Sequence, residues 1–296
     1  MGRRRSPLAG ARAADYGAVM VQLAPEGDRI LIGPRCTVAF QRTLRVPEDG
    51  RVYPLPPGLG RLPIHRVGVT YGVPNPATEE SVGTAPDGTV DDMLRAIGAA
   101  RRAFDEGTWP RSSREERARA LLRIADAMER RKEEMRRLLI AEAGATYLTH
   151  GMQVEAPIEH LRHWADLARR FAFEEPLPTR IAQGPMGPQV NSGIVVRQPV
   201  GVCGMIPTWN FPVYVSVQKL APALAAGCTM VFKPSPWGPL INLFLAELVA
   251  EADLPPGVVN IVTGESPAIA EALVNDARVD KISFTGSVGT GRKSIA

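Results

Sequence analysis

The periodicity of hydrophobic and polar positions along the chain changes near residue 200. Between residues 89 and 171, apolar side chains recur at three- and four-residue spacing, which is typical of helices that bury one face. After residue 200, short apolar runs alternate with helical stretches. We therefore predict helices in the first part and alternating strands and helices in the second.

Three helices are expected before residue 174. The first covers about residues 89–104. The second begins at a capping box formed by Ser113 and Glu116 and ends near Gly144, a residue suited to a helix C-terminus. The third covers about residues 152–171, with its apolar side chains on one side.

Four apolar strands with intervening helices are expected after residue 198. Fully apolar strands are typical of sheets buried on both faces, and strand–helix–strand units give right-handed crossovers. The pattern therefore predicts an α/β fold with a parallel sheet, whose ligands bind at the carboxyl ends of the strands. The strands are expected at about residues 200–206, 229–232, 258–262 and 281–284.

Each predicted strand ends in a polar loop rich in proline, glycine or serine. Ordinary turn residues explain any single loop, but four such loops at one edge of a sheet favour a ligand site. In the last loop, Gly286 and Gly291 let the backbone approach a ligand, and Ser287 lies where a helix N-terminus can hold a phosphate. The loops are Pro207–Pro212, Lys233–Pro239, Thr263–Pro267 and Thr285–Gly291.

Five motifs resemble the aldehyde dehydrogenase superfamily, in order and at matching spacing. They are Pro207-Thr-Trp-Asn-Phe-Pro212, Lys219-Leu-Ala-Pro-Ala-Leu-Ala-Ala-Gly227, Lys233-Pro-Ser235, Leu254-Pro-Pro-Gly-Val-Val-Asn-Ile-Val-Thr-Gly264 and Phe284-Thr-Gly-Ser287. Asn75-Pro-Ala-Thr78 and Ala99-Ala-Arg-Arg-Ala-Phe104 resemble the N-terminal part of the family. The resemblance covers about residues 67–296. It implies a Rossmann-like NAD(P)-binding domain over this range, with residues 174–198 as part of an oligomerisation arm, and homo-oligomeric full-length relatives.

The resemblance also implies a chemistry. In this family a cysteine thiolate attacks an aldehyde, an asparagine amide holds the oxyanion, hydride passes to NAD(P)+, and a glutamate activates water to release the carboxylic acid. Asn210 matches the oxyanion-hole asparagine, with a helix N-cap as the alternative. Lys219 matches a lysine near the active centre, with a helix-surface position as the alternative. The positions that match cofactor contacts are Ile206, Pro207, Trp209, Lys233, Gly264, Thr285, Gly286 and Ser287, with Lys233 at the ribose hydroxyls.

Two departures from the family pattern affect the expected activity. Many NAD-using members carry a glutamate after Lys-Pro-Ser that binds the ribose 2′-hydroxyl, but Pro236 stands there in this chain. We therefore expect NAD as the cofactor, with NADP also possible. The family's nucleophilic cysteine and glutamate base lie beyond the Phe284–Ser287 motif and are absent from residues 1–296.

The three cysteines do not replace the missing nucleophile. Cys203 falls inside a predicted buried strand, Cys228 precedes the amino end of another, and Cys36 lies in the unmatched N-terminal region. We therefore expect a chain of the aldehyde dehydrogenase family that is inactive alone. The alternatives are a non-catalytic nucleotide-binding or interaction fragment, or one half of a split enzyme.

Composition excludes several other classes of protein. The net charge of +4 is spread among mixed acids and bases, so no nucleic-acid partner is expected, and no apolar run is long enough to cross a membrane. The odd, widely spaced cysteines favour a reducing compartment, the cytoplasm. His160 and His163 have helical spacing but no third ligand, so no metal is expected.

Residues 1–66 are rich in arginine, proline and glycine and match nothing in the family. Met1–Ser6 and the short apolar stretch after residue 17 resemble a secretory or twin-arginine signal only weakly, because no clean cleavage site follows. We expect this region to be irregular or disordered.

Overall fold

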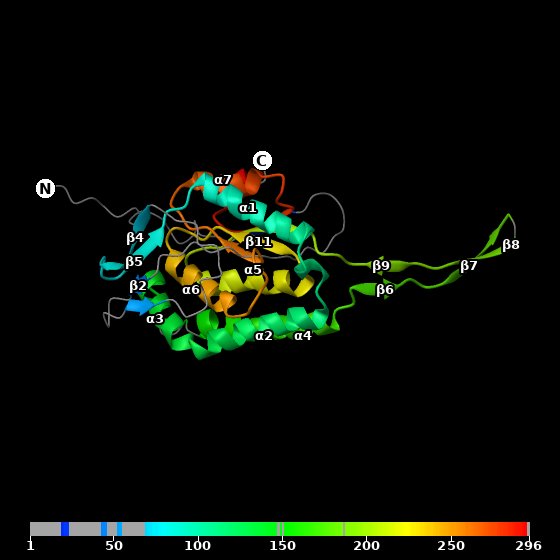
Figure 1. The fold of residues 1–296 in the computed structure, drawn as a ribbon, viewed down its shortest axis with the longest axis horizontal. Helices are drawn as coiled ribbons and strands as arrows, with labels where there is room; N and C mark the ends of the chain where they lie inside the picture. The colour runs from blue at the N-terminus through cyan, green and yellow to red at the C-terminus, as the bar shows by residue number, and fades with distance from the viewer. Residues whose placement is uncertain are drawn as a thin grey trace.

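The computed structural model describes residues 69–146, 149, 151–185 and 187–294, together with three short strands at 19–23, 43–45 and 52–54. The centre of the molecule is a five-stranded sheet with helices on both faces (Figure 1). The predicted α/β class is confirmed.

The sheet has the order β1-β13-β10-β11-β12. Strands β10 to β13 are parallel to one another, and β1 joins the edge of the sheet antiparallel to β13. The chain passes outward from β10 through β11 to β12 and then returns to the other side of β10 as β13. The strand order therefore reverses between β10 and β13, which is where ligands bind in open sheets of this kind. The bounds are β1 Val19–Leu23, β10 Val202–Ile206, β11 Thr229–Phe232, β12 Val259–Ile261 and β13 Lys281–Gly286.

Two helices cover each face of the parallel strands. Helices α1 (Val90–Asp105) and α7 (Pro267–Asn275) pack on one face, and α5 (Pro212–Ala226) and α6 (Pro239–Ala250) on the other (Figure 1). The parallel strands are mostly buried and mostly apolar because both of their faces are covered. A short helix, α8 (Val288–Lys293), follows β13, as the sequence predicted.

An outer layer of helices covers α5 and α6. It consists of α2 (Arg114–Arg130), α3 (Lys132–Ala143), a π-helical turn at Gly151–Glu155 and α4 (Ala156–Arg170). The capping box of Ser113 and Glu116 is confirmed, but the single helix predicted from there to Gly144 is interrupted at Arg131.

The interruption at Arg131 has a structural cause. The Arg131 guanidinium binds Glu134 in the next turn and Glu247 on α6, each at 2.9 Å, and lies over the Phe244 ring. These contacts fix the junction of α2 and α3 against α6. They join residues far apart in sequence, so helical periodicity alone did not indicate the break.

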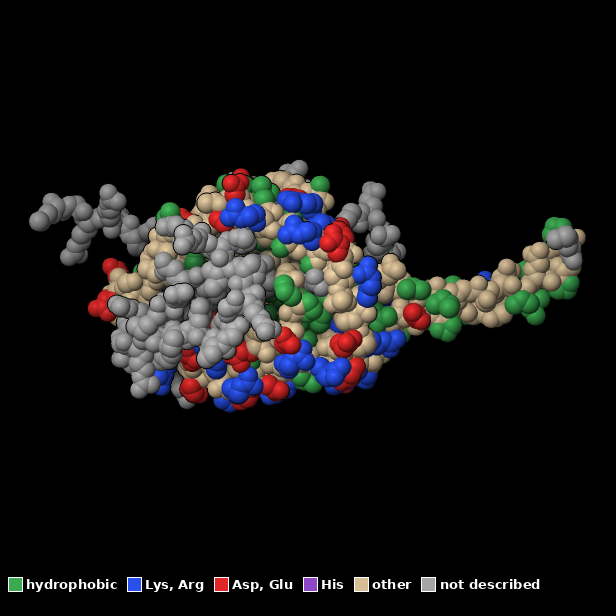
Figure 2. Space-filling model, viewed as in Figure 1, with side chains coloured by type: hydrophobic (Ala, Val, Ile, Leu, Met, Phe, Trp, Pro, Cys, Tyr) green, Lys and Arg blue, Asp and Glu red, His purple; other side chains and the backbone are tan. Residues whose placement is uncertain are grey.

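Two pairs of strands form an arm that projects from the body (Figure 1). In the arm, β6 (Glu174–Pro176) pairs with β9 (Ile194–Val196), and β7 (Arg180–Gly184) pairs with β8 (Gly187–Asn191). Most side chains of these strands are exposed, and apolar ones follow the arm to its tip (Figure 2). The arm therefore has no hydrophobic core of its own.

The N-terminal part of the described chain supplies further strands. A hairpin of β4 (Thr70–Pro74) and β5 (Ser81–Pro86) precedes α1, and a 3-10 turn at Trp109–Arg111 follows it. Within residues 1–66, β1 forms from the apolar stretch near residue 20, and β2 (Thr43–Arg45) pairs with β3 (Val52–Pro54). We expected residues 1–66 to be irregular or disordered, and these three short strands are the parts of that region that the structure describes. The remainder of residues 1–66, including Cys36, lies outside the described residues.

No helix of the described chain is both long and apolar enough to span a membrane.

Candidate functional site

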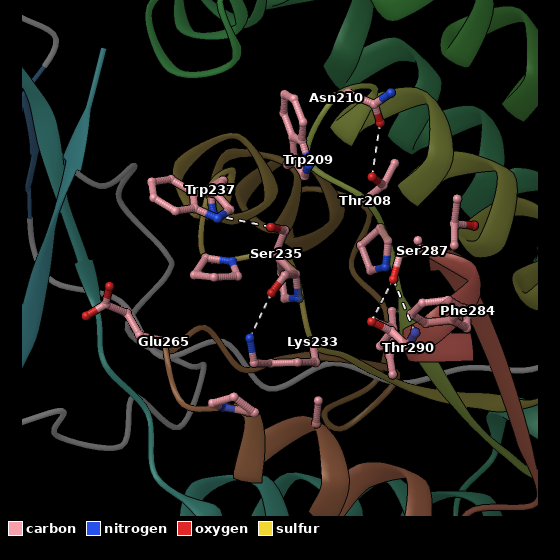
Figure 3. A pocket seen from close by; sticks show the side chains of 18 of the residues that line it. Thr208, Trp209, Asn210, Lys233, Ser235, Trp237, Glu265, Phe284, Ser287 and Thr290 are labelled. Carbon is pink, nitrogen blue, oxygen red and sulfur yellow. Dashed lines mark hydrogen bonds between the residues drawn. The ribbon is translucent and has the colours of Figure 1, made fainter. Parts of the chain in front are cut away.

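A cavity of about 700 Å³ opens at the carboxyl ends of β10, β11 and β13 (Figure 3). Its walls are the loops that follow these strands, the loop between β12 (Val259–Ile261) and α7, and the starts of α7 and α8. Asn210 lines it, together with seven of the eight predicted cofactor contacts. The seven are Ile206, Pro207, Trp209, Lys233, Thr285, Gly286 and Ser287. The eighth, Gly264, is the residue before Glu265, which lines the cavity.

Lys233 is held at the end of β11 by backbone carbonyls. Its Nζ donates to the carbonyl oxygens of Pro234 at 2.9 Å and Gly264 at 2.8 Å. The side chain is 5% exposed, and burial lowers the pKa of the ammonium to about 8. A charged ammonium has three donors, so two are used within the protein and one is left for a ligand.

The loop that carries Gly264 is fixed by the segment between β5 and α1. Gly88 donates its N–H to the Thr263 carbonyl at 3.0 Å, and the Asp87 carboxylate accepts from the Glu265 N–H at 3.0 Å. Gly264 has a φ of +153°, and a Cβ there would lie 2.5 Å from Ile269 Cδ1. Only glycine fits this position without strain. Asp87 and Gly88 had no sequence signal, because their role depends on a contact with a distant loop.

Asn210 presents a free amide at the cavity. Its Oδ1 accepts from the Thr208 hydroxyl at 3.0 Å, and its Nδ2 donates to no described residue (Figure 3). The alternative role as a helix N-cap is wrong, because Phe211 occupies the N-cap of α5 and no side chain caps that helix. Gln153, from the π-helical turn, donates to the Asn210 carbonyl at 3.4 Å and was not indicated by the sequence.

Lys219 lies behind the cavity rather than on the surface of α5. It is 4% exposed, and its Nζ donates to the hydroxyls of Ser283 at 3.0 Å and Thr285 at 2.9 Å. Burial, with a smaller effect of Lys281, lowers the pKa of Lys219 to about 8. The helix-surface alternative is therefore wrong, since Lys219 faces β13 of the central sheet. Lys219 supports Thr285, which lines the cavity.

Gly286 and Ser287 have structural roles within the last loop. A Cβ at Gly286 would lie 2.5 Å from Phe284 Cζ, so a larger residue there would require the Phe284 ring to move. Ser287 is the N-cap of α8, where its hydroxyl oxygen accepts from the Thr290 N–H at 3.2 Å. Both residues nevertheless lie at the cavity wall.

Two tryptophans give the cavity flat apolar surfaces. Trp209 is 38% exposed and Trp237 is 59% exposed, although each is a large aromatic side chain (Figure 3). Exposed aromatic faces beside a cationic group suit a ligand that combines planar rings with negative charge.

The two described cysteines lie away from the cavity. Cys203 is buried within β10, and Cys228 is buried just before β11, where its Sγ accepts from the Val200 N–H. A hydrogen bond to Cys228 and burial raise the pKa of the Cys203 thiol, which disfavours a thiolate. Neither is placed to attack a ligand in the cavity.

The histidine pair on α4 is engaged in an ordinary side-chain contact. His160 Nε2 accepts a hydrogen bond from Trp164 Nε1 at 3.0 Å. Across the part of the chain that the structure describes, no three histidine, cysteine or acidic side chains gather as a metal site would require.

Comparison with known proteins agrees with this geometry. The model of the aldehyde dehydrogenase family matches residues 66–296. Geranial dehydrogenase of Castellaniella defragrans is 42% identical over 220 residues, which is 74% of this chain and 44% of that protein. Betaine aldehyde dehydrogenase of Bacillus subtilis is 38% identical over 219 residues, which is 74% of this chain and 43% of that protein.

Solved structures show the same relationship. Betaine aldehyde dehydrogenase from Staphylococcus aureus, in complex with NAD+, has a TM-score of 0.69 and 31% identity, and the match covers 77% of this chain and 43% of that one. The chain thus spans less than half the length of the relatives that it matches.

Proposed function

Because this chain belongs to the aldehyde dehydrogenase family, we propose that its cavity binds NAD(P)+ and that Asn210 supplies the oxyanion donor for aldehyde oxidation. The proposed substrate is an aldehyde and the proposed product is the carboxylic acid. The observation that carries the proposal is the third donor of Lys233, left unused at a cavity lined by seven of the residues that match cofactor contacts.

The residues present fit the cofactor. Lys233 can donate to a ribose hydroxyl, and Trp209 and Trp237 provide flat surfaces for planar rings. Gly286 and Ser287 bring backbone to the cavity wall without a bulky side chain. The Staphylococcus aureus relative was solved with NAD+, which supports the same assignment here.

Asn210 suits the second part of the proposal. When bound, NAD(P)+ provides the hydride acceptor of the reaction. A neutral amide stabilises a developing oxyanion without titrating, and the Asn210 Nδ2 is free to donate. The Thr208 hydroxyl donates to the Asn210 Oδ1, so the Nδ2 is the end of the amide that is left to donate to the oxyanion.

The nucleophile is not provided by Cys203 or Cys228, because both are buried outside the cavity. We therefore propose that residues 1–296 by themselves bind the nucleotide but do not oxidise aldehydes. The cysteine and the glutamate base that the reaction requires would come from other residues, in a longer chain or in a second polypeptide.

The arm supports a role in self-association. Its exposed apolar side chains lie on β7, β8, β9 and the segment that joins β6 to β7, where no core covers them (Figure 2). Apolar surface of this kind marks contact sites, and unpaired strand edges favour pairing with another strand. We propose that a second copy of this chain covers the arm. The side chains are Leu177, Ile181, Val190, Ile194, Val195 and Val196.

Isothermal titration with NAD+ tests the nucleotide assignment. The wild-type chain is expected to bind, and Lys233→Met is expected to bind at least about tenfold more weakly, because a charge-assisted hydrogen bond is lost. Lys132→Met is the matched control, since Lys132, at the start of α3, pairs with Glu129 on α2 and does not line the cavity. Equal affinity in wild type and Lys233→Met contradicts the proposal.

Incubation of the wild type with NAD+ and an aldehyde panel is expected to give no NADH absorbance.

A further inference from the structure

The loop after β11 has no acid at the position where NAD-using relatives are expected to recognise the ribose. Pro234, Ser235, Pro236 and Trp237 line the cavity there, and none of them can accept a hydrogen bond through a carboxylate. The loop after β11 therefore has no side chain that would favour the ribose 2′-hydroxyl of NAD over the 2′-phosphate of NADP.

The neighbouring loop carries a carboxylate in the same cavity. Glu265 lines it and is the only acid among the described residues that do so (Figure 3). It directly follows Gly264, whose carbonyl accepts from Lys233 Nζ at 2.8 Å. Glu265 is therefore the next residue in the chain after the one whose carbonyl holds Lys233 at the cavity.

The backbone of Glu265 is fixed, and its side chain is free. The Asp87 carboxylate accepts from the Glu265 N–H at 3.0 Å, and the φ of Gly264 locks the preceding turn. The Glu265 carboxylate makes no hydrogen bond or ion pair with any other described residue. It is therefore available to a ligand from a well-defined position.

Charge around Lys233 disfavours an additional phosphate. Two carboxylates lie on this side of the cavity. The negative charge of Asp87 raises the pKa of Lys233, against the larger lowering by burial, and Glu265 lines the cavity. A 2′-phosphate carries negative charge, and like charges in a partly enclosed site repel more strongly than in water.

We propose that Glu265 replaces the carboxylate that the loop after β11 lacks: it accepts a hydrogen bond from the ribose 2′-hydroxyl and makes the site select NAD+ over NADP+. The proposal rests on the proposed nucleotide binding and deepens it. Glu265 is thereby a specificity-determining residue of the cofactor site, with Asp87 as a positioning residue through the backbone of Glu265.

The test is the ratio of dissociation constants for NADP+ and NAD+, measured by isothermal titration. Wild type is expected to favour NAD+, and Glu265→Gln is expected to lower that preference by about tenfold, the scale of one charge-assisted hydrogen bond. Glu271→Gln is the matched control, because Glu271 is exposed on α7 and does not line the cavity. The double variant Glu265→Gln with Pro236→Glu is expected to regain the preference for NAD+.

The outcomes separate the two proposals. An unchanged ratio in Glu265→Gln, or a wild type that prefers NADP+, overturns the role of Glu265 while nucleotide binding stands. A wild type that binds neither dinucleotide overturns the proposed function, and the role of Glu265 with it. Because the Glu265 side chain is exposed and makes no hydrogen bond or ion pair with another described residue, its replacement is not expected to disturb folding.

Discussion

Lys233 Nζ donates a 2.8 Å hydrogen bond to the carbonyl of Gly264, which joins the loop after β11 to the loop after β12. The same ammonium group is the one that we assign to the cofactor ribose. One side chain thus fixes the relative position of two cavity loops and presents its remaining donor to the ligand.

Nucleotide affinity is expected to fall as the pH rises through about 8. The pKa of Lys233 is lowered to about 8, so below this value the ammonium keeps a third donor for the ligand. Above it the neutral amine has two hydrogens, and the carbonyls of Pro234 and Gly264 use both. We expect NAD+ to bind roughly tenfold more weakly at about pH 9 than at about pH 7, measured by isothermal titration.

Lys233→Arg is the control for this pH dependence. A guanidinium stays charged over the whole range, so the affinity of this variant is expected to be the same at both pH values, whatever its absolute strength. A wild type whose affinity does not change with pH would contradict the assignment of Lys233. A parallel decline in both proteins would point to another titrating group.

Replacement of Gly264 by alanine is expected to weaken both folding and binding. Alanine at a φ of +153° is strained, and its Cβ would lie 2.5 Å from Ile269 Cδ1. We expect a loss of about 1–3 kcal/mol in the free energy of unfolding, measured with denaturant, and weaker NAD+ binding because Lys233 loses its fixed partner. Gly289→Ala is the matched control, since a Cβ there meets nothing within 4 Å. Equal stability of the two variants would contradict the account of this loop.

Glu142 is expected to make a pH-dependent contribution to stability. It is buried on α3 and accepts from the N–H groups of Leu240 at 2.6 Å and Ile241 at 2.8 Å, in the first turn of α6. Burial raises its pKa from 4.5 to about 8, against the effect of these two hydrogen bonds. A raised pKa in the folded state gives a contribution that is complete below 4.5 and is lost as the pH rises through about 8.

Glu142→Gln isolates this contribution. The amide keeps one acceptor oxygen, so one N–H at the start of α6 loses its partner, at a cost of about 1–3 kcal/mol. Denaturant unfolding of both proteins across this pH range is expected to show the stability advantage of the wild type shrinking toward pH 8. A constant difference would mean that Glu142 is ionised throughout in the folded protein.

The arm is expected to mediate self-association through its apolar pairs. Ile181 and Val190 lie directly opposite each other on β7 and β8 and are 74% and 69% exposed. The double variant Ile181→Thr with Val190→Thr keeps β-branched side chains but removes apolar surface. Sedimentation is expected to show a shift toward the monomer. Gln183→Thr, on the same arm, is expected to behave as wild type, and an unchanged mass in the double variant would contradict the proposal.

Local patterns in the sequence predicted the elements that depend on local interactions. The capping box of Ser113 and Glu116 and the helix opened by Ser287 are present because a side chain bonds the backbone three residues away. The parallel sheet followed from short, mostly apolar strands separated by helices. Lys233 and Asn210 were found because the loops that carry them match a known family in register.

Features that depend on distant contacts were not predictable in this way. The break at Arg131 comes from Glu247 and Phe244 on α6, and the turn at Gly264 is held by Asp87 from a segment far earlier in the chain. The burial of Lys219 likewise depends on the packing of α5 against β13. In each case the partner is separated by more than a hundred residues or lies on another layer, so spacing along the chain carries no information about it.

Amide hydrogen exchange with and without saturating NAD+ tests the central claim, that a nucleotide binds where the sheet order reverses. The account predicts slower exchange in the loops around the cavity, at residues 206–210, 233–238, 264–267 and 285–290, and little change in the arm or the outer helices. Protection confined to another part of the chain, or none at a concentration that saturates binding, would contradict it.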